Sequence, residues 1–129
     1  MTDAAPAAEP PPALQTLRDV HAHYIRQASC PSDVAILTFD IVPTSGWGHT
    51  GLWVELAEEV RIVGDPLPLA YLNAFTSGIE EEWERRFPGV PLRATLSLNE
   101  VKVHPVDSHE RSFRKAGHRA IEGILARLA

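Results

Sequence analysis

The helical spacing of apolar residues near the C-terminus constrains the fold of this chain more than any other feature. Asp107 and Glu110 stand before this run at the spacing of a capping box, in which both side chains bond free backbone groups of a first turn. Apolar residues then recur at intervals of three and four, the period of one helix face, at Phe113, Ala116, Ala120, Ile121, Ile124, Leu125 and Leu128. A helix over residues 108–128 is therefore predicted, with one face in the core.

Alternation of apolar and polar residues predicts strands in the middle of the chain. Residues 34–42 are mostly β-branched and apolar, and residues 52–58 alternate in the same way. The loop between them, 43–51, holds three glycines, which favours a hairpin. A short strand over 61–63 and another over 92–98 complete the predicted sheet.

A second helix is predicted over residues 69–86, where apolar side chains share one face before the Pro88-Gly89 break. The resulting order of elements is β-β-β-α-β-α. This order predicts an α+β fold, a two-layer sandwich in which the helices pack on one face of a mixed sheet.

Composition divides the chain into three regions. Residues 1–12 are mostly alanine and proline, typical of a disordered tail. Residues 13–33 are predicted to form an N-terminal extension whose apolar spacing favours a helix, and residues 34–129 the folded domain. With 129 residues, 44% of them hydrophobic, the chain supports one core, and no run approaches the roughly 18 apolar residues of a membrane span. The single cysteine, Cys30, excludes an internal disulfide and fits a cytoplasmic location.

Three ordered motifs link the chain to a known family. The pattern His-x-Val-Asp-Ser-Ser-Glu-x-x-Phe-x-x-Ala is matched at His104, Val106, Asp107, Ser108, Glu110, Phe113 and Ala116. Upstream lie the glycine-rich run Ser45-Gly46-Trp47-Gly48-His49-Thr50-Gly51 and a Tyr-x-x-Ala-x-x-x-Gly-Ile-x-Glu pattern at Tyr71, Ala74, Gly78, Ile79 and Glu81. In these motifs the chain resembles the fourth domain of translation elongation factor G and of its eukaryotic and archaeal counterparts, standing alone.

The resemblance implies a noncatalytic module that binds the ribosome or a structured RNA, in the same α+β sandwich and without a cofactor. In the family, the glycine-rich loop and the histidine loop form a tip that enters the decoding site. Carried over by motif, the binding residues are Ser45, Gly46, Trp47, Gly48, His49, Gly51 and His104. No Gly-x-x-x-x-Gly-Lys-Ser/Thr loop is present in the sequence, so no GTPase activity of its own is expected.

The glycine-rich run departs from the family at Trp47 and His49, where the family has small, basic or polar residues. Trp47 is suited to stacking on a base or to packing against another protein. The glycines alternatively serve only a tight hairpin, and His104 alone is also compatible with an ordinary surface histidine.

Charge is unevenly distributed along the chain. The net charge is −5, yet residues 101–129 hold six basic and three acidic residues. On the last predicted helix, Arg111 and Arg114 lie opposite the apolar stripe with Lys115, His118 and Arg119. This face is either an ordinary solvated surface or a phosphate-contacting surface beside His104, and the second interpretation adds Arg111 and Arg114 to the binding site.

Three further interpretations are considered. The acidic runs Glu58-Glu59 and Glu80-Glu81-Glu82 favour a protein-interaction or orphan structural domain that kept the fold without RNA binding. A hydrolytic site would combine His104, Asp107 and Ser108, joined by His49 if the two loops are neighbours. His21 and His23 would face one side of a strand and bind a metal with a third ligand, but the sequence places no third ligand and no metal site is predicted.

Overall fold

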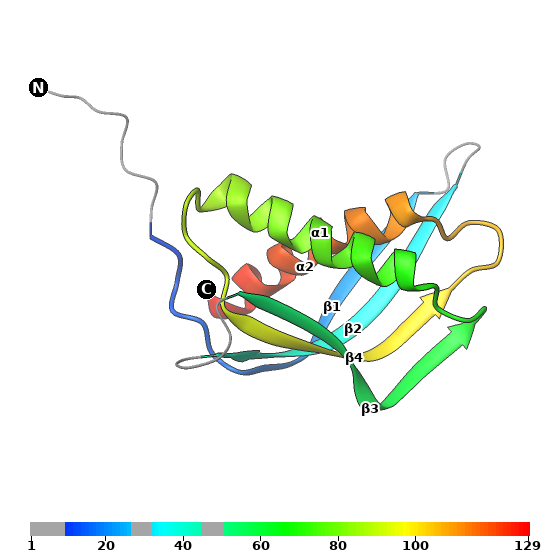
Figure 1. The fold of residues 1–129 in the computed structure, drawn as a ribbon, viewed down its shortest axis with the longest axis horizontal. Helices are drawn as coiled ribbons and strands as arrows, with labels where there is room; N and C mark the ends of the chain where they lie inside the picture. The colour runs from blue at the N-terminus through cyan, green and yellow to red at the C-terminus, as the bar shows by residue number, and fades with distance from the viewer. Residues whose placement is uncertain (1–9, 27–31, 45–50) are drawn as a thin grey trace, which may run out of the picture.

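The computed structural model describes residues 10–26, 32–44 and 51–129, which form four strands and two helices (Figure 1). In chain order these are β1 (Leu17–Arg26), β2 (Asp33–Pro43), β3 (Leu52–Gly64), α1 (Leu69–Arg86), β4 (Ala94–Val103) and α2 (Glu110–Leu128). Both helices lie on one face of the sheet, so the predicted two-layer α+β sandwich and the β-β-β-α-β-α order are confirmed. No helix in the described part of the chain is long and apolar enough to cross a membrane.

The sheet has the strand order β1-β2-β4-β3. β1 and β2 pair antiparallel, β2 and β4 pair antiparallel, and β3 and β4 run parallel. The predicted hairpin between residues 34–42 and 52–58 is therefore wrong, because β4 lies between β2 and β3. Alternation and turn residues identify strands, but they do not identify which later strand will insert between them. The parallel pair is instead joined by α1, as parallel strands require a long crossover.

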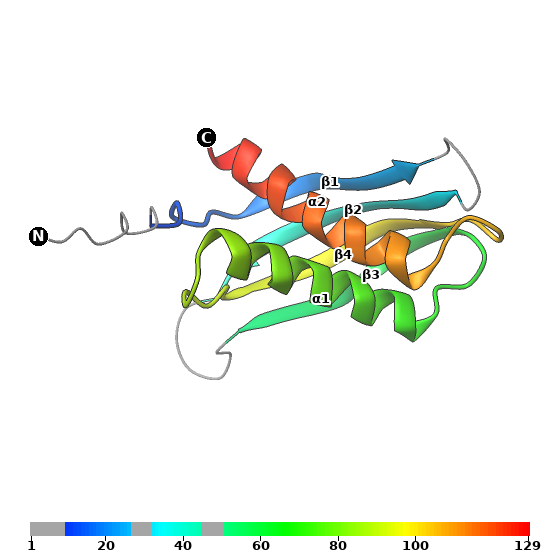
Figure 2. The same ribbon diagram turned by 90° about the horizontal axis from the view of Figure 1, so that it is seen from above.

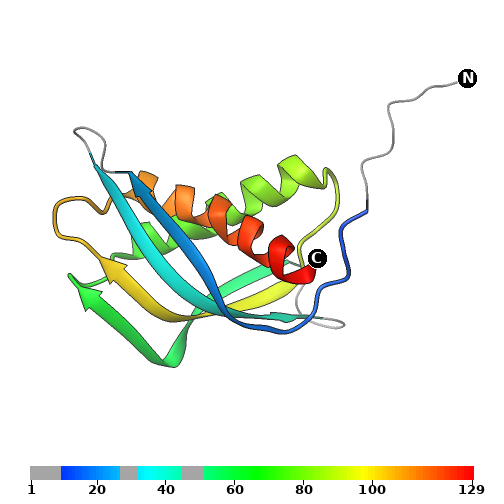
Figure 3. The same ribbon diagram turned by 180° about the vertical axis from the view of Figure 1, so that it is seen from behind.

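The segment predicted as a helical extension, 13–33, contains strand β1, and that prediction is wrong. Leu17 and Val20 both face the core although they are three residues apart, which mimics helical spacing. The cause is a bulge between them, where Asp19 has a positive φ of 51° and shifts the strand period by one residue. β1 forms one edge of the sheet beside β2 (Figure 3), so the folded domain begins before residue 34.

The two strands predicted at 52–58 and 61–63 form one strand, β3. Leu56 pairs with Leu98 and Arg61 with Glu100, so four residues of β3 stand opposite the single residue Asn99 of β4. This irregularity bends the strand sharply (Figure 1) and divides it into a first arm, Leu52–Leu56, and a second arm over 61–64.

The core fills the space between the sheet and the helices. α2 packs over β1 and β2, and α1 lies beside it toward β3 (Figure 2). Each large side chain that is fully buried contributes about 1.5–3 kcal/mol relative to an exposed position. The largest are Leu37, Phe39, Ile41, Phe75, Ile79, Leu96, Leu98, Phe113, Ile121 and Ile124. The apolar faces predicted for both helices are thus confirmed.

The two helices touch through Gly78 of α1 and Gly117 of α2. A Cβ atom on Gly78 would lie 2.0 Å from the carbonyl oxygen of Arg114, and one on Gly117 would lie 2.4 Å from that of Phe75. Both distances are far below van der Waals contact with backbone atoms that have little freedom to move. Glycine is therefore required at both positions by the close approach of the helices.

We expect Gly78→Ala and Gly117→Ala each to lower the free energy of unfolding by about 1–2 kcal/mol in urea denaturation. Alanine gains up to about 1 kcal/mol of helix propensity, but overpacking against backbone costs roughly 1–3 kcal/mol or more. Gly51→Ala is the control, because nothing lies within 4 Å of the added Cβ there. Unchanged stability in the two helix variants would contradict this account of the helix contact.

Candidate nucleic-acid interface

His104 lies in a compact turn between β4 and α2. The backbone N–H of His104 donates to Ser108 Oγ at 2.8 Å, and the N–H of Ser108 donates back to the carbonyl oxygen of His104 at 3.1 Å. The turn is also bonded to the start of β2. Ser108 Oγ donates to the carbonyl oxygen of Val34 at 2.7 Å, and the N–H of Val34 donates to the carbonyl oxygen of Asp107 at 2.9 Å. The turn thus has a fixed shape rather than that of a loose loop.

The imidazole of His104 is held within this turn but remains 48% exposed. Its Nδ1 accepts hydrogen bonds from the backbone N–H groups of Val106 at 3.3 Å and Asp107 at 3.1 Å. A neutral imidazole that accepts at Nδ1 carries its proton on Nε2. Within the described residues Nε2 has no hydrogen-bond partner, so it is a preoriented donor for an outside group.

The serine of the turn does not support the hydrolytic arrangement considered from the sequence. Ser108 is buried, and its hydroxyl donates to the carbonyl oxygen of Val34 instead of to the imidazole of His104. Asp107 lies 3.5 Å from His104 Nδ1, the nitrogen that already accepts two backbone bonds. The contacts therefore describe a structural turn, not an assembled nucleophile and base.

The predicted cap of α2 is also shifted. α2 begins at Glu110 with His109 as its N-cap, and the N–H of His109 donates to Ser112 Oγ at 3.1 Å. Asp107 therefore is not the cap, and Glu110 does not complete a box, because the turn ends two residues later than predicted. The side chain of Ser112 takes the role that was assigned to Glu110.

The glycine-rich run and His104 attach to opposite ends of the sheet. Pro43 and Leu52, which flank the run at the ends of β2 and β3, both pair with Ala94 at the start of β4, whereas His104 follows the last residue of β4. The ten residues of β4 separate these ends by roughly 30 Å. Gly51 is described and lies at the Ala94 end, and Ser45, Gly46, Trp47, Gly48 and His49 lie outside the described residues.

The hairpin of β1 and β2 flanks His104 instead. Arg26 at the end of β1 pairs with Asp33 at the start of β2, next to the Val34 contacts of the turn. Sequence reasoning missed this neighbourhood, because the strand character of β1 was hidden by its bulge. The exposed alternation of His21 and His23 around buried Ala22 was the signal that could have revealed it.

Arg111, one of the residues predicted to contact phosphate, forms an ion pair with the buried carboxylate of Asp33. Asp33 is 2% exposed, and its Oδ1 accepts hydrogen bonds from Arg111 at 3.1 Å and from Ser112 Oγ at 2.9 Å. Burial raises the pKa of Asp33, but the hydrogen bonds from Arg111 and Ser112 outweigh that effect and hold it below its usual value. The side chain of Arg111 is 54% exposed, so its guanidinium lies at the surface while the carboxylate of Asp33 compensates its charge.

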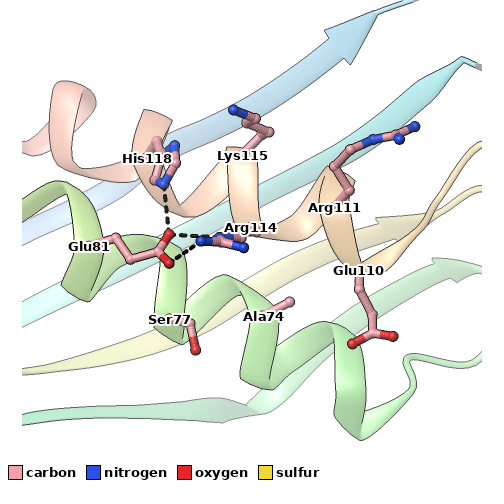
Figure 4. Close-up of a pocket in the computed structure, with 8 residues that line it drawn as sticks. All are labelled: Ala74, Ser77, Glu81, Glu110, Arg111, Arg114, Lys115 and His118. Atoms are coloured by element: carbon pink, nitrogen blue, oxygen red, sulfur yellow. Dashed lines mark hydrogen bonds and ion pairs between the residues drawn. The ribbon is translucent and has the colours of Figure 1, made fainter.

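Arg114, the other predicted cation, is bound to Glu81 across the groove between the helices (Figure 4). The carboxylate of Glu81 is also hydrogen-bonded to His118 Nε2 at 3.1 Å. The hydrogen bond from Arg114 lowers the pKa of Glu81. This groove has a volume of about 660 Å³ and is lined by Ala74, Ser77, Glu81, Glu110, Arg111, Arg114, Lys115 and His118. Glu81 compensates Arg114, and Asp33 compensates Arg111, whereas Lys115 has no acidic partner among the described residues. The basic face of α2 therefore carries less uncompensated charge than the sequence predicts.

Cations without an acidic partner remain near His104. Within the described residues, seven of the 12 Lys and Arg side chains form ion pairs. The other five are Arg26, Arg93, Lys102, Lys115 and Arg127. Lys102 stands two residues before His104 on β4, and Arg26 ends the neighbouring hairpin strand. These two side chains were not predicted, and they supply free positive charge beside the turn.

His21 and His23 are arranged as expected for two residues that face one side of a strand. His21 and His23 lie on the same face with ring centroids 5.0 Å apart. Burial, followed by the proximity of His21, lowers the pKa of His23. Among the described residues, no group of three or more His, Cys, Asp or Glu side chains is placed to hold a metal ion.

Comparison with known proteins shows similarity of fold. The chain is similar to the crystal structure of ttk003000868 from Thermus thermophilus, with a TM-score of 0.65 over 88% of this chain and 19% sequence identity. It spans only 16% of that chain, so the matching domain is a small part of a larger protein there. No protein-family model matches the sequence. At this identity the likeness concerns the fold alone, and function must be argued from the site.

We expect Asp33→Asn to lower the free energy of unfolding by about 1–2 kcal/mol at pH 7, because it replaces charged hydrogen bonds by neutral ones. The pKa of Asp33 is lower in the folded state than its ordinary value of 3.8. The stability that it provides is therefore fully present above the unfolded-state pKa and is lost as the pH falls through the folded-state pKa. Urea denaturation of both proteins from pH 7 to pH 3 should show a constant difference above about pH 5 that shrinks below about pH 4. A difference independent of pH would contradict this role of the carboxylate.

Proposed function

We propose that this chain is a noncatalytic module, resembling the fourth domain of elongation factor G, that binds the ribosome or a structured RNA through the His104 turn. The fold supports the proposal, because its order of elements agrees with the architecture that the resemblance implies. The observation that carries the proposal is the exposed imidazole whose Nδ1 is fixed by Val106 and Asp107, leaving Nε2 to donate outward. A ribosome-bound role places the protein in the cytoplasm.

The chemistry of this surface suits an RNA backbone. The Nε2–H group of His104 can donate to a phosphate oxygen or to a 2′-hydroxyl, the contacts by which proteins recognise RNA shape. Lys102 and Arg26 add charge that no carboxylate of the described residues compensates, whereas Arg111 and Arg114 form ion pairs with Asp33 and Glu81. With two or three phosphate contacts, log Kd should change with log salt by a slope of only about 2–3, so binding is weak and salt-sensitive.

The proposed surface differs from the one carried over by motif. It is centred on His104, Lys102 and Arg26, and the glycine-rich run is attached at the far end of β4. A single compact RNA contact therefore does not require Gly51 or the residues before it. Trp47, which lies outside the described residues, remains a candidate for a separate contact.

The alternative function is a protein-interaction or orphan structural domain without RNA binding. The neutralised charges on α2 favour it, since Glu81 alone binds both Arg114 and His118. In this case His104 would be a surface histidine whose main role is to close the turn.

The proposal is tested by co-sedimentation of the purified protein with ribosomes and with separate subunits at low and moderate salt. We expect saturable binding that His104→Ala weakens about tenfold, as for the loss of a charge-assisted hydrogen bond. Lys102→Ala should weaken binding about threefold to tenfold and reduce the salt slope by about one.

Arg127→Ala is the matched control, because Arg127 is an exposed cation in the last turn of α2, far from His104, and it too has no acidic partner in the described part of the chain. Trp47→Ala shows separately whether the glycine-rich run contributes. Absence of binding to either subunit at low salt, or equal loss of binding in the Lys102 and Arg127 variants, would rule out the His104 surface and favour the alternative.

A further inference from the structure

A further pocket lies on the helix layer, beside the groove of Figure 4, with which it shares Lys115 and His118. Its volume is about 300 Å³, at the lower end of the range for small-molecule sites. α1, α2 and β1 all contribute side chains, so the pocket exists only in the folded domain. The lining residues are Tyr24, Glu82, Arg85, Arg86, Lys115, His118, Arg119 and Glu122.

Helix periodicity and the close approach of the two helices assemble this pocket. Its α1 residues are three or four positions apart, and so are its α2 residues, so each set lies on one face of its helix. The contact of Gly78 with Gly117 holds the helices side by side. The hydrogen bond with Glu82, and to a smaller extent the charge of Glu122, raise the pKa of Arg85, so side chains of both helices act on this guanidinium.

Positive charge exceeds negative charge in the pocket. Four of the lining side chains are Lys or Arg and two are Glu, which leaves a surplus of two positive charges without counting His118. This surplus is local, because the chain as a whole has a net charge of −5. The pocket therefore attracts an anion, and a dianion would compensate the whole surplus.

Two arginines share the single carboxylate of Glu82. Arg85 donates to it from Nε at 3.0 Å and from a terminal nitrogen at 2.6 Å, and Arg86 donates from Nε at 2.7 Å. The bond from Arg85 is the largest effect on this carboxyl group, and with the bond from Arg86 it outweighs burial and lowers the pKa of Glu82 to about 2. One carboxylate compensates only one of the two guanidinium charges. Both terminal nitrogens of Arg86 have no partner among the described residues.

Other donors of the pocket also lack an acceptor within the described part of the chain. Lys115 points away from Glu81 (Figure 4), and neither its Nζ nor the hydroxyl of Tyr24 has a hydrogen-bond partner there. Arg119 donates to Glu122 at 3.1 Å through one terminal nitrogen, which leaves its Nε and its other terminal nitrogen. Free N–H and O–H groups of this kind bind the oxygens of a phosphate group.

We propose that this pocket binds a phosphate dianion, either free or at the end of a small phosphomonoester. Such a group carries about −1.5 to −2 charges near pH 7 and has three acceptor oxygens, which match the surplus charge and the free donors. Arg86, Lys115 and Arg119 supply the positive charge, and Tyr24 supplies a hydroxyl. A carboxylate or a phosphodiester has one negative charge and would compensate half of the surplus. The inference concerns a different surface from the His104 turn and does not depend on the proposed function.

The test is isothermal titration calorimetry of the full chain at low salt and about pH 7.5, where a phosphomonoester is mostly a dianion. AMP, cyclic AMP, adenosine and inorganic phosphate are titrated separately. We expect saturable binding of AMP, about tenfold weaker binding of cyclic AMP, whose phosphodiester has one charge, and no binding of adenosine. Tighter binding of AMP than of inorganic phosphate would support the site with a phosphomonoester as its ligand, and equal or weaker binding of AMP would support it with free phosphate.

Four variants test the residues of the pocket. Lys115→Gln and Arg119→Gln should each weaken binding of AMP about tenfold, because each removes a charged donor. Tyr24→Phe should weaken it about threefold through loss of the hydroxyl. Glu122→Gln should instead strengthen binding about threefold, because this carboxylate competes with the phosphate for Arg119.

The matched controls are Arg127→Gln and Glu58→Gln, which change the net charge equally at exposed positions outside the pocket. Each should alter the affinity for AMP less than about twofold, because charges in solvent are screened. Equal effects in the pocket and control variants, or equal affinity for AMP, cyclic AMP and adenosine, would overturn the proposal. Absence of saturable binding of both AMP and inorganic phosphate would overturn it as well.

Discussion

The buried carboxylate of Asp33 connects the start of β2 to the first turn of α2, and the shape of the His104 turn depends on this connection. It accepts hydrogen bonds from Ser112 and Arg111 in the first turn of α2, while the next residue along β2, Val34, bonds the His104 turn through both its N–H and its C=O. A buried charge without partners is costly, and these partners come from another element. Satisfying the carboxylate therefore requires strand, turn and helix to be in place together. The shape of the turn follows from that requirement more than from its own short sequence.

Sequence patterns predicted elements of the fold better than they predicted how those elements pair. The helices were found because long amphipathic periods leave few alternatives, and residues 69–86 agree with α1 to the residue. β1 was mistaken for a helix because the bulge at Asp19 places Leu17 and Val20 three residues apart on one face. The position of β4 between β2 and β3 had no local signal, since it results from the crossover through α1 and from the burial of Leu96 and Leu98 on the core face.

The sequence predicted an exposed turn at His104, but it did not predict the side chains that surround this turn. His104 was identified by motif, but the partners of the nearby basic residues lie far away in sequence. Asp33 is 78 residues from Arg111, and Glu81 is 33 residues from Arg114. Helix periodicity correctly placed both arginines on the solvent side, yet it contains no information on which acidic residue faces them from another element. The free charges of Arg26 and Lys102 became apparent only when β1 and β4 were placed in one sheet.

β4 has a further consequence as an inner strand of the sheet. It is hydrogen-bonded along both edges, to β2 and to β3, so stretching or bending it would break two ladders at once. The close contact of Gly78 with Gly117 also restricts movement of α1 and α2 relative to each other. The His104 turn and the first residues of β3 lie at opposite ends of this strand. The two ends of the domain are thus held at a constant separation of roughly 30 Å.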